Sequence, residues 1–505
     1  MTLTDLLELA SQKAGNRVFL HKEKEKRTFK NIHDNSLRFA LGLSKLGVKK
    51  GDRVAMLLGN SFEFVTAYFA VIRLGAEIVP LNTFLRVEEV NYILNDCRAK
   101  IFITSSDFSG IMKDFNGNLV PALEKVISTD SIEANHMLFE SVYESGVYSP
   151  NISAEEDTAV IIYTSGTTGF PKGAVLSHRN LVSNVIGSCE AIKIRDNDRF
   201  ILFLPMFHAF SFTVCVLIPL YKMCYVRIIK SIQPFSNIIK SLVFDRITLF
   251  VAIPPVYNVL AAKKIPAIAL WLIKIRLCVS GAAPLSGEVL QKFEKKFKLP
   301  LLEGYGLSEA SPVVSVNPFD GVRKAGSVGP AIPRVNVAIM DENGKPLKVN
   351  ETGEIAVSGP NVMKGYLNKP EETAEVIKDG WLFTGDIGRM DEDGYIFIMD
   401  RKKDLIIVNG MNLYPREVEE IIYKMGPVEE TAVVGKKDEK HGEIPIGVVK
   451  LREGQSATDI EIRKYLKKHI ANYKIPHRFE FWTEMPKTGT GKILKREIKR
   501  IINEK

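Results

Sequence analysis

Residues 158–173, TAVIIYTSGTTGFPKG, largely decide the fold of this 505-residue chain. The first six are apolar and rich in β-branched side chains, which predicts a buried strand over Thr158–Tyr163. The next ten, Thr164–Gly173, contain three glycines, four hydroxyl side chains and Lys172. Glycines let backbone amides approach an anion closely, hydroxyls add donors and the lysine adds a positive charge. The loop is therefore predicted to hold phosphate groups.

The loop is not a Walker A motif, which places Ser or Thr directly after the lysine. In this chain Pro171 precedes Lys172 and Gly173 follows it. A second short strand, AVLS, comes next, and Ser177 is placed to cap the helix after it. A ligand-free flexible loop is the alternative interpretation, but an embedded Pro-Lys-Gly directly after a strand disfavours it.

Short apolar runs alternate with helix-like stretches through the first 250 residues. The predicted strands span residues 53–58, 76–81, 99–104, 245–253 and 275–280. Because these runs are apolar on both faces, we expect mainly parallel sheets covered by helices. From about residue 325, short strands alternate with Gly-containing turns, which is typical of a small β-rich subdomain. A boundary is predicted at Asp400–Asp404, followed by a small α+β domain.

Composition and charge place the chain among ordinary globular enzymes, with 46% apolar and 25% charged residues. The formal net charge of +9 suits an acidic ligand such as a nucleotide or CoA, and suits a solvated basic surface equally well. We expect no nucleic-acid partner.

The five cysteines form no CxxC pair, so neither a disulfide framework nor a zinc site is indicated. The N-terminus lacks a basic start followed by an apolar run, so no signal peptide is predicted. We therefore expect a cytoplasmic protein.

One uncharged run, Ile201–Tyr221, is 21 residues long and resembles a membrane span by hydropathy. Pro205 and His208 interrupt it, so we predict a strand, a loop and a helix that line an apolar pocket, and no transmembrane helix. Lysines and arginines follow the run, which leaves open a peripheral contact with the inner membrane face.

Segments in the same order as the signatures of the adenylate-forming (ANL) superfamily run through the whole chain. That superfamily contains acyl-CoA synthetases, aryl-CoA ligases, luciferases and the adenylation domains of peptide synthetases. Residues 163–175 (YTSGTTGFPKGAV) resemble its phosphate-loop signature. The other matching segments are PMFH at 205–208, SGAAP at 280–284, GYGLSE at 304–309, GYLN at 365–368, WLFTGD at 381–386, DRKKDLIIVNG at 400–410 and PKTGTGK at 486–492.

The resemblance implies an α/β fold with two domains. Residues 1–399 would form the AMP-binding adenylation domain, with two helix-covered, mainly parallel sheets and a small β-barrel subdomain. Residues 400–404 would be the hinge, with Lys402 and Lys403 at its centre, and residues 405–505 a small mobile α+β domain.

The resemblance also implies an ATP-dependent acyl-CoA synthetase that works in two steps. A carboxylate attacks the α-phosphorus of ATP and releases pyrophosphate, and the thiol of CoA then displaces AMP. Tyr305 would stack on adenine, while Asp386 and Arg401 would hold the ribose. The full set of implied nucleotide-binding residues is Thr164, Ser165, Gly166, Thr167, Thr168, Gly169, Lys172, Gly281, Ala282, Ala283, Gly304, Tyr305, Gly306, Ser308, Asp386 and Arg401.

Three residues carry the implied chemistry. Lys492 would bridge the carboxylate and phosphate oxygens as negative charge develops. Glu309 would ligate Mg²⁺, which favours carboxylate oxygen. His208 would lie between the acyl pocket and the thiol channel. We expect Lys495 and the basic residues after it to be merely solvated.

The acid is expected to be apolar, a medium- or long-chain fatty acid. The pocket should be formed by the segment after His208 and by residues 253–257, Gly281, Gly304 and 313–314, with Phe210 or Phe212 as a gate. Residues 209–213 contain no acid that would hold an amino group, and none of the tryptophans Trp271, Trp381 and Trp482 lies in the expected lining. An aryl-CoA ligase and an acyl-AMP ligase that loads a carrier-protein phosphopantetheine are the alternatives. A homodimer is compatible with the sequence.

Overall fold

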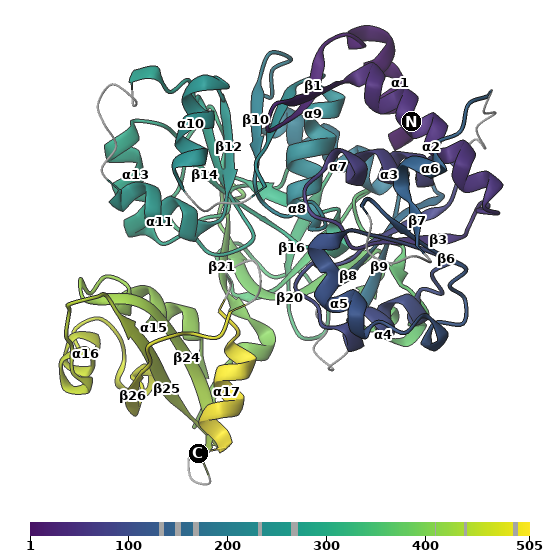
Figure 1. Ribbon diagram of the computed structural model, residues 1–505. Coiled ribbons are helices and arrows are strands. Elements are labelled where there is room, and N and C mark those ends of the chain that lie inside the picture. The colour runs from purple at the N-terminus through teal and green to yellow at the C-terminus, as the bar shows by residue number, and fades with distance from the viewer. Residues whose placement is uncertain are drawn as a thin grey trace.

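The computed structural model of the protein describes residues 1–130, 136–146, 153–164, 171–230, 235–263, 271–409, 411–438, 442–487 and 493–504. A large part contains the chain up to about residue 400, and a smaller part follows it (Figure 1). The N-terminus lies on the large part and the C-terminus on the small part (Figure 1).

The phosphate-loop strand lies in an eight-stranded sheet. From edge to edge its strands are β18 (Gly365–Tyr366), β9 (Lys172–Ser177), β8 (Thr158–Thr164), β4 (Glu77–Pro80), β3 (Arg53–Met56), β5 (Ile101–Thr104), β6 (Lys125–Ser128) and β7 (Met137–Leu138). The pairs from β8 to β7 are parallel, whereas β9 pairs antiparallel with both β8 and β18. Since β18 pairs with β9, the GYLN segment lies beside the end of the phosphate loop.

A second eight-stranded sheet carries most of the remaining motifs. Its strands in order are β15 (Val313–Val316), β14 (Leu301–Gly306), β13 (Leu277–Ser280), β12 (Leu249–Ala252), β10 (Arg199–Leu202), β11 (Tyr225–Ile228), β1 (Val18–Lys22) and β2 (Glu25–Thr28). All pairs between β14 and β1 are parallel. The sequence correctly predicted two mainly parallel sheets covered by helices.

Helices cover both sheets. They are α1 (Leu3–Ala14), α2 (Phe29–Lys45), α3 (Phe62–Arg73), α4 (Val87–Asp96), α5 (Ser109–Asp114), α6 (Phe139–Val142), α7 (His178–Ala191), α10 (Ser236–Phe244), α11 (Pro254–Ala262), α13 (Gly287–Phe297) and α14 (Pro370–Val376). Ser177 caps α7 as predicted, since its side chain accepts a hydrogen bond from the amide of Asn180.

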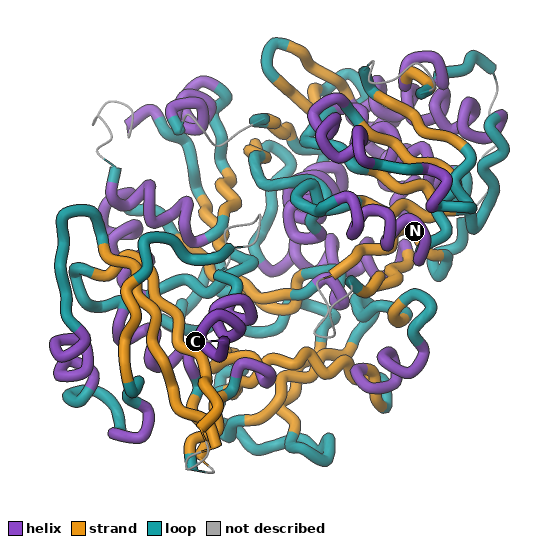
Figure 2. Tube along the Cα trace, turned by 60° about the horizontal axis from the view of Figure 1, so that its bottom comes forward, coloured by secondary structure: helices purple, strands orange, loops and turns teal. Residues whose placement is uncertain are grey.

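The β-rich region after residue 325 forms an antiparallel sheet of β16 (Asn336–Met340), β17 (Gly353–Ser358), β20 (Trp381–Met390), β19 (Ile377–Lys378) and β21 (Ile396–Arg401). The small part has its own sheet of β23 (Met411–Leu413), β22 (Ile406–Val408), β25 (Gly442–Leu451), β24 (Val428–Asp438) and β26 (Arg478–Phe481). Helices α15 (Pro415–Ile422), α16 (Asp459–Leu466) and α17 (Lys495–Glu504) accompany it (Figure 2). Both sheets agree with the predicted fold class.

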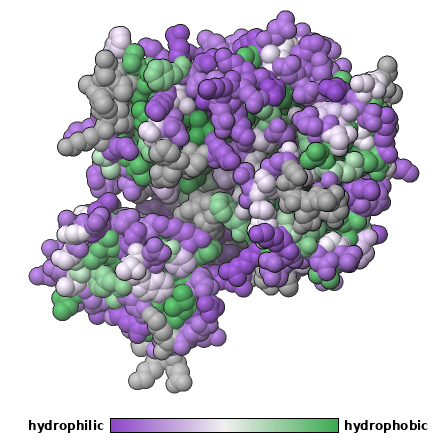
Figure 3. All heavy atoms as spheres, viewed as in Figure 1, coloured by the Kyte–Doolittle hydropathy of each residue, from purple (hydrophilic) through white to green (hydrophobic). Residues whose placement is uncertain are grey.

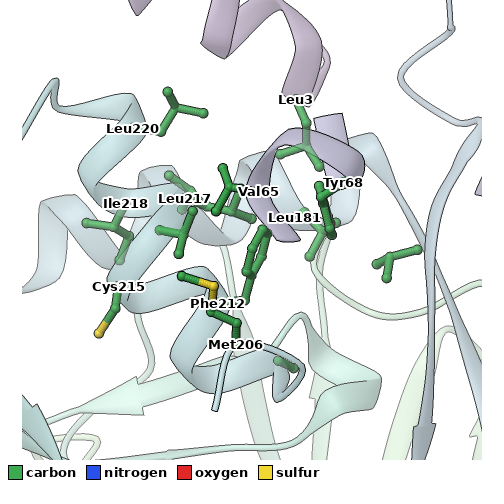
Figure 4. Close-up of a cluster of buried hydrophobic side chains, with 14 of the residues drawn as sticks. Leu3, Val65, Tyr68, Leu181, Met206, Phe212, Cys215, Leu217, Ile218 and Leu220 are labelled. Atoms are coloured by element: carbon green, nitrogen blue, oxygen red, sulfur yellow. The ribbon is translucent and has the colours of Figure 1, made fainter. Parts of the chain in front are cut away.

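The uncharged run at 201–221 lies in the core of the large part. Strand β10 is followed by α8 (Ala209–Phe212), a π-helical turn at Thr213–Leu217 and α9 (Ile218–Tyr221). Its side chains pack against α1, α3 and α7, and Figure 4 shows Phe212 among Val65, Tyr68 and Leu181. Within the described part of the chain, no helix is both long enough and apolar enough to cross a membrane.

Candidate active site

The phosphate loop joins the ends of two paired strands. Thr164 is the last residue of β8, Lys172 the first of β9, and the two residues face each other in the ladder. Ser165, Gly166, Thr167, Thr168 and Gly169, which the sequence predicts to bind phosphate, lie outside the described residues.

Glu309 lies beside both ends of this loop. It belongs to a short 3₁₀ turn (Ser308–Ala310) after β14, and its carbonyl accepts a hydrogen bond from the Met363 amide at 2.8 Å. Its carboxylate accepts hydrogen bonds from the Thr164 hydroxyl at 3.3 Å and from the Tyr366 hydroxyl at 3.0 Å. The Nζ atom of Lys172 lies 5.3 Å from the centre of the Tyr366 ring. A carboxylate, a hydroxyl and an ammonium thus converge where phosphates would bind.

Tyr366 is a residue of this site to which the sequence gave no role. Burial and the neighbouring Glu309 raise the pKa of its hydroxyl, so it stays protonated and donates to the carboxylate. The only signal in the sequence is its place in the GYLN segment, since the contact joins residues that lie 57 positions apart.

Asp386 lies on β20 and contacts Tyr305 of β14. Gly385 precedes it with a φ of 71°, a left-handed conformation that favours glycine and bends β20 at this point. The Asp386 carboxylate accepts a hydrogen bond from the Tyr305 hydroxyl at 2.6 Å and pairs with Arg401 Nε at 3.0 Å. Burial and Asp386 raise the pKa of Tyr305, and Asp386 raises the pKa of Arg401. The tyrosine therefore stays protonated and donates a hydrogen bond to the carboxylate that also pairs with the guanidinium.

The SGAAP segment begins at the last residue of β13, and the GYGLSE segment begins within the last three residues of the neighbouring parallel strand β14, so both lie at the carboxyl ends of these strands. This edge of a parallel sheet is where ligands generally bind. The Ala282 backbone has a φ of 65° and its side chain is exposed, while Gly281 is buried against the ring of Phe210. The structure therefore gathers Gly281, Ala282, Ala283, Gly304, Tyr305, Gly306 and Ser308 from these two segments at one edge.

His208 lines a cavity of about 630 Å³ beside this edge. Burial lowers the pKa of the imidazole, and Nδ1 accepts a hydrogen bond from the Phe210 amide at 3.3 Å. The ring is therefore neutral at neutral pH, and a hydrogen bond fixes its orientation. The cavity is mainly apolar, and its lining includes Leu58, Phe84, Phe203, Leu204, Phe207, Phe210, Phe235, Ile253, Val256 and Val259.

Several predicted lining residues are elsewhere. Phe210 lines the cavity, but Phe212 packs into the core with its ring centre 4.4 Å from that of Tyr68. Residues two positions apart on a helix are rotated by about 200° around its axis, so the side chains of Phe210 and Phe212 point to opposite sides. Tyr257 is fully buried with its hydroxyl bonded to the carbonyl oxygens of Phe250 and Val279. Gly281, Gly304, Val313 and Val314 are also absent from the lining, although Gly281 lies against the ring of Phe210.

The catalytic lysine that the sequence predicts, Lys492, lies outside the described residues. On one side of it, Ile493 forms a bridge with Lys487. At the predicted hinge, Lys402 pairs with Glu354 at 2.8 Å, while Lys403 is exposed.

The prediction that Lys495 is a solvated tail residue is wrong. Its side chain is only 20% exposed and its ammonium lies 2.9 Å from Glu419. Helix α17 begins at this residue and packs Ile498 and Ile502 into the small part, which draws the lysine inward.

The donors around Glu309 fit a magnesium ion held through phosphates. Across the described ranges, no three His, Cys, Asp or Glu side chains are grouped as metal ligands. Mg²⁺ commonly binds one or two carboxylates together with substrate phosphates and waters, so a single acid beside a phosphate loop is sufficient.

Two family models match the chain. The AMP-binding enzyme family matches residues 7–367, and the AMP-binding enzyme C-terminal domain matches residues 417–492. A long-chain-fatty-acid–CoA ligase of Bacillus subtilis is 36% identical, with 98% of this chain and 94% of the relative covered. A feruloyl-CoA synthase of an Amycolatopsis species is 34% identical, with 94% and 93% covered.

Among solved structures, ATP-bound MatB from Rhodopseudomonas palustris gives a TM-score of 0.92 at 29% identity, covering 100% of this chain and 99% of the other. Apo MatB from the same organism has the same identity and coverage but a TM-score of 0.81. Because identity and coverage are equal, the difference between the scores reflects conformation. The overall conformation of this chain is therefore closer to that of the ATP-bound form.

Proposed function

We propose, from the premise that this chain belongs to the AMP-binding enzyme family and is an AMP-forming acid–CoA ligase, that its acid is a medium- or long-chain fatty acid. The observation that carries the proposal is the cavity of about 630 Å³ beside His208. A group the size of a water molecule occupies about 30 Å³, so the cavity has room for roughly twenty such groups. Burial of each methylene contributes about 0.8 kcal/mol, which favours long apolar acids.

The likeness to a fatty-acid ligase supports this choice. The similar identity to a feruloyl-CoA synthase, together with the Phe84, Phe207 and Phe210 rings in the cavity lining, makes an aryl acid the second candidate. A carrier-protein thiol in place of CoA is the third, because no residue among the described part of the site distinguishes the two acceptors.

In the first step an oxygen of the substrate carboxylate forms a bond to the α-phosphorus of ATP, and the bond to pyrophosphate breaks. Both reactants are anions, so the site must neutralise charge and align the groups. Lys172 and Thr164 would hold the β- and γ-phosphates together with Ser165 and Thr168. Glu309 would hold Mg²⁺, which supplies positive charge to those phosphates, and Tyr366 orients the Glu309 carboxylate.

Asp386 and Arg401 would hold the ribose hydroxyls, with the Tyr305 ring against adenine. The Tyr305–Asp386 hydrogen bond fixes the carboxylate before the nucleotide arrives. Lys492 would neutralise the charge that develops between carboxylate and phosphate. In the second step the sulfur of CoA attacks the acyl carbonyl and AMP leaves, with neutral His208 beside the path of the thiol.

A panel of acids from acetate to oleate, with benzoate, coumarate and amino acids, tests the proposal. Pyrophosphate release is measured with and without CoA, and AMP and acyl-CoA are quantified. We expect kcat/KM to rise with chain length up to the capacity of the cavity. A maximum with coumarate would favour the aryl acid, and adenylation without transfer to CoA would favour a carrier-protein acceptor.

We also propose a cytoplasmic location with contact to the inner membrane face. The support is two exposed aromatic side chains, Phe244 at the end of α10, which is 81% exposed, and Trp271, which is 77% exposed and has Lys274 Nζ 5.8 Å from its ring centre. The face seen in Figure 3 is mostly hydrophilic, with hydrophobic residues in small groups. Co-sedimentation with phosphatidylglycerol vesicles, against phosphatidylcholine vesicles, checks the contact. Homodimer formation stays a prediction that light scattering would check.

A further inference from the structure

A cluster of buried charges lies where the two parts of the molecule meet. Lys495 Nζ lies 2.9 Å from Glu419 Oε1 and 4.0 Å from Asp400 Oδ1. The other oxygen of Asp400 accepts a hydrogen bond from the Arg416 backbone amide at 2.7 Å. Asp400 belongs to β21 of the large part, whereas the other three residues belong to the small part. The cluster therefore joins the two parts directly.

Asp400 acts as a helix cap supplied from outside the small part. Tyr414, the residue that precedes α15, makes no capping hydrogen bond with its side chain. The first amides of a helix need acceptors, and a carboxylate there also interacts favourably with the helix dipole. Asp400 satisfies one of these amides, that of Arg416, the second residue of α15.

Strand β21 connects this cluster to the nucleotide site. Successive side chains of a strand point to opposite faces, and Arg401 points to Asp386 while its neighbour Asp400 points to α15 and α17. In the ladder, Asp386 lies opposite Arg401 and Ile387 opposite Asp400. A small rotation of this end of β21 would therefore change the contacts of Arg401 and of Asp400 together.

Because these charges are buried, the contact is favourable only while both partners are in place. The Asp400 side chain is 5% exposed and the Glu419 side chain 10%. Burial opposes ionisation of Lys495, but Glu419 and Asp400 outweigh it and raise the pKa of the ammonium, which stays charged. A buried charge that loses its partner is strongly unfavourable. Separation of the two parts must therefore return Asp400 to water or give it new partners.

We propose that Asp400, Lys495 and the Arg416 amide form an interdomain clamp that holds the small part in the arrangement used for adenylate formation, and that this clamp opens when the hinge turns for the thioester step. The proposal rests on the two-step function proposed above. The closer overall likeness to the ATP-bound than to the apo structure of MatB supports the assignment to the first step. Asp400 and Lys495 are positioning residues in this scheme, since they act through the position of the small part.

Asp400→Asn tests the clamp, because asparagine can still accept from the Arg416 amide but offers Lys495 no charge. We expect pyrophosphate release to slow about tenfold, the loss expected for one charge-assisted contact. Thioester formation from preformed acyl-AMP should keep its rate or accelerate. Lys495→Arg should retain most of the adenylation rate, while Lys495→Met should behave as Asp400→Asn if it folds.

Lys474→Met is the matched control. Lys474 pairs with Glu417 at 2.6 Å and is 19% exposed, so it is as buried as Lys495, but its pair lies within the small part. This variant should leave the ratio of the two half-reaction rates unchanged even if it lowers stability.

A distance measurement gives a second readout. The five native cysteines are buried, so cysteines placed at the exposed positions Glu351 and Gln455 would be labelled selectively for energy transfer between the two parts. With ATP bound, Asp400→Asn should shift the distance distribution away from that of the unsubstituted protein, and Lys474→Met should not. Equal slowing of both half-reactions, or unchanged rates or distances in Asp400→Asn, overturns the clamp. Absence of adenylation by the unsubstituted protein with every acid would instead overturn the proposed function.

Discussion

The contact between Gly281 and Phe210 predicts how acyl chain length is selected. A Cβ atom at Gly281 would lie 2.8 Å from Cζ and 3.0 Å from Cε2 of the Phe210 ring. Carbon atoms pack at about 3.5–4.0 Å, so Gly281→Ala requires the ring to move by about 1 Å. The end of a flexible side chain can make this movement, and the cavity offers the space. The ring should therefore intrude into the cavity.

The size of the effect follows from the length that the chain loses. A shift of about 1 Å removes room for roughly one or two methylenes, and each contributes about 0.8 kcal/mol when buried, a factor of about four in kcat/KM. For the longest acid accepted, kcat/KM should fall about 4- to 15-fold, while shorter acids should change little. Any effect on ATP binding would be the same for all acids, so the dependence on chain length isolates the cavity.

The assay is pyrophosphate release with saturated acids of six to eighteen carbons. Gly287→Ala is the control, because a Cβ atom there meets nothing within 4 Å. Phe210→Ala should restore long acids in the Gly281→Ala background, so the double-mutant cycle should show strong coupling. A uniform loss at every chain length, or additive effects of the two substitutions, would refute the reasoning.

Four further predictions concern single residues. Tyr366→Phe removes the hydrogen bond to Glu309 and should lower kcat/KM for MgATP about fivefold without changing the melting temperature; an unchanged kcat/KM for MgATP across magnesium concentrations would contradict it. Lys492→Ala should abolish pyrophosphate release yet leave thioester formation from preformed acyl-AMP nearly intact, and equal loss in both half-reactions would count against its role. Lys403→Pro should slow the thioester step more than adenylation, as single-turnover rates would show. Burial raises the pKa of Glu303 to about 7, so the folded protein holds a proton that the unfolded chain releases above about pH 4.5, and stability should fall as pH rises through this window. Glu303→Gln should reduce by about 3 kcal/mol the loss of unfolding free energy between pH 5 and pH 8, as measured by urea unfolding. An identical pH dependence in both proteins would disprove the assignment.

The strand interiors were predictable because burial on both faces selects apolar residues throughout. The ends of the strands were less predictable, because hydrogen-bond partners and turns decide where a strand begins and ends. The sequence predicted a strand over 245–253, but β12 begins at Leu249. The side chain of Asp245 bonds to Tyr225, and Arg246 has a φ of 50°, so the chain is still turning there.

The site was predictable where short motifs carry it and unpredictable where distant segments meet. The motif residues Tyr305 and Asp386 lie together, as the resemblance led us to expect. Tyr366 and Lys495 were missed because their partners come from other elements, and no local pattern encodes such contacts. Phe210 and Phe212 could not be told apart, since only the packing of their helix decides which of them faces the cavity.

Closure of the clamp and binding of ATP must be thermodynamically coupled. If the arrangement held by Asp400 binds ATP more tightly than the alternative, ATP must favour that arrangement by the same factor, because coupling between two equilibria is reciprocal. The acyl-adenylate keeps the ribose that Asp386 and Arg401 would hold but lacks the β- and γ-phosphates, so the contacts that ATP would make with Thr164, Lys172 and Glu309 are lost after the first step. The departure of pyrophosphate would then weaken the preference that keeps Asp400 paired with Lys495, and the hinge could turn without any further signal.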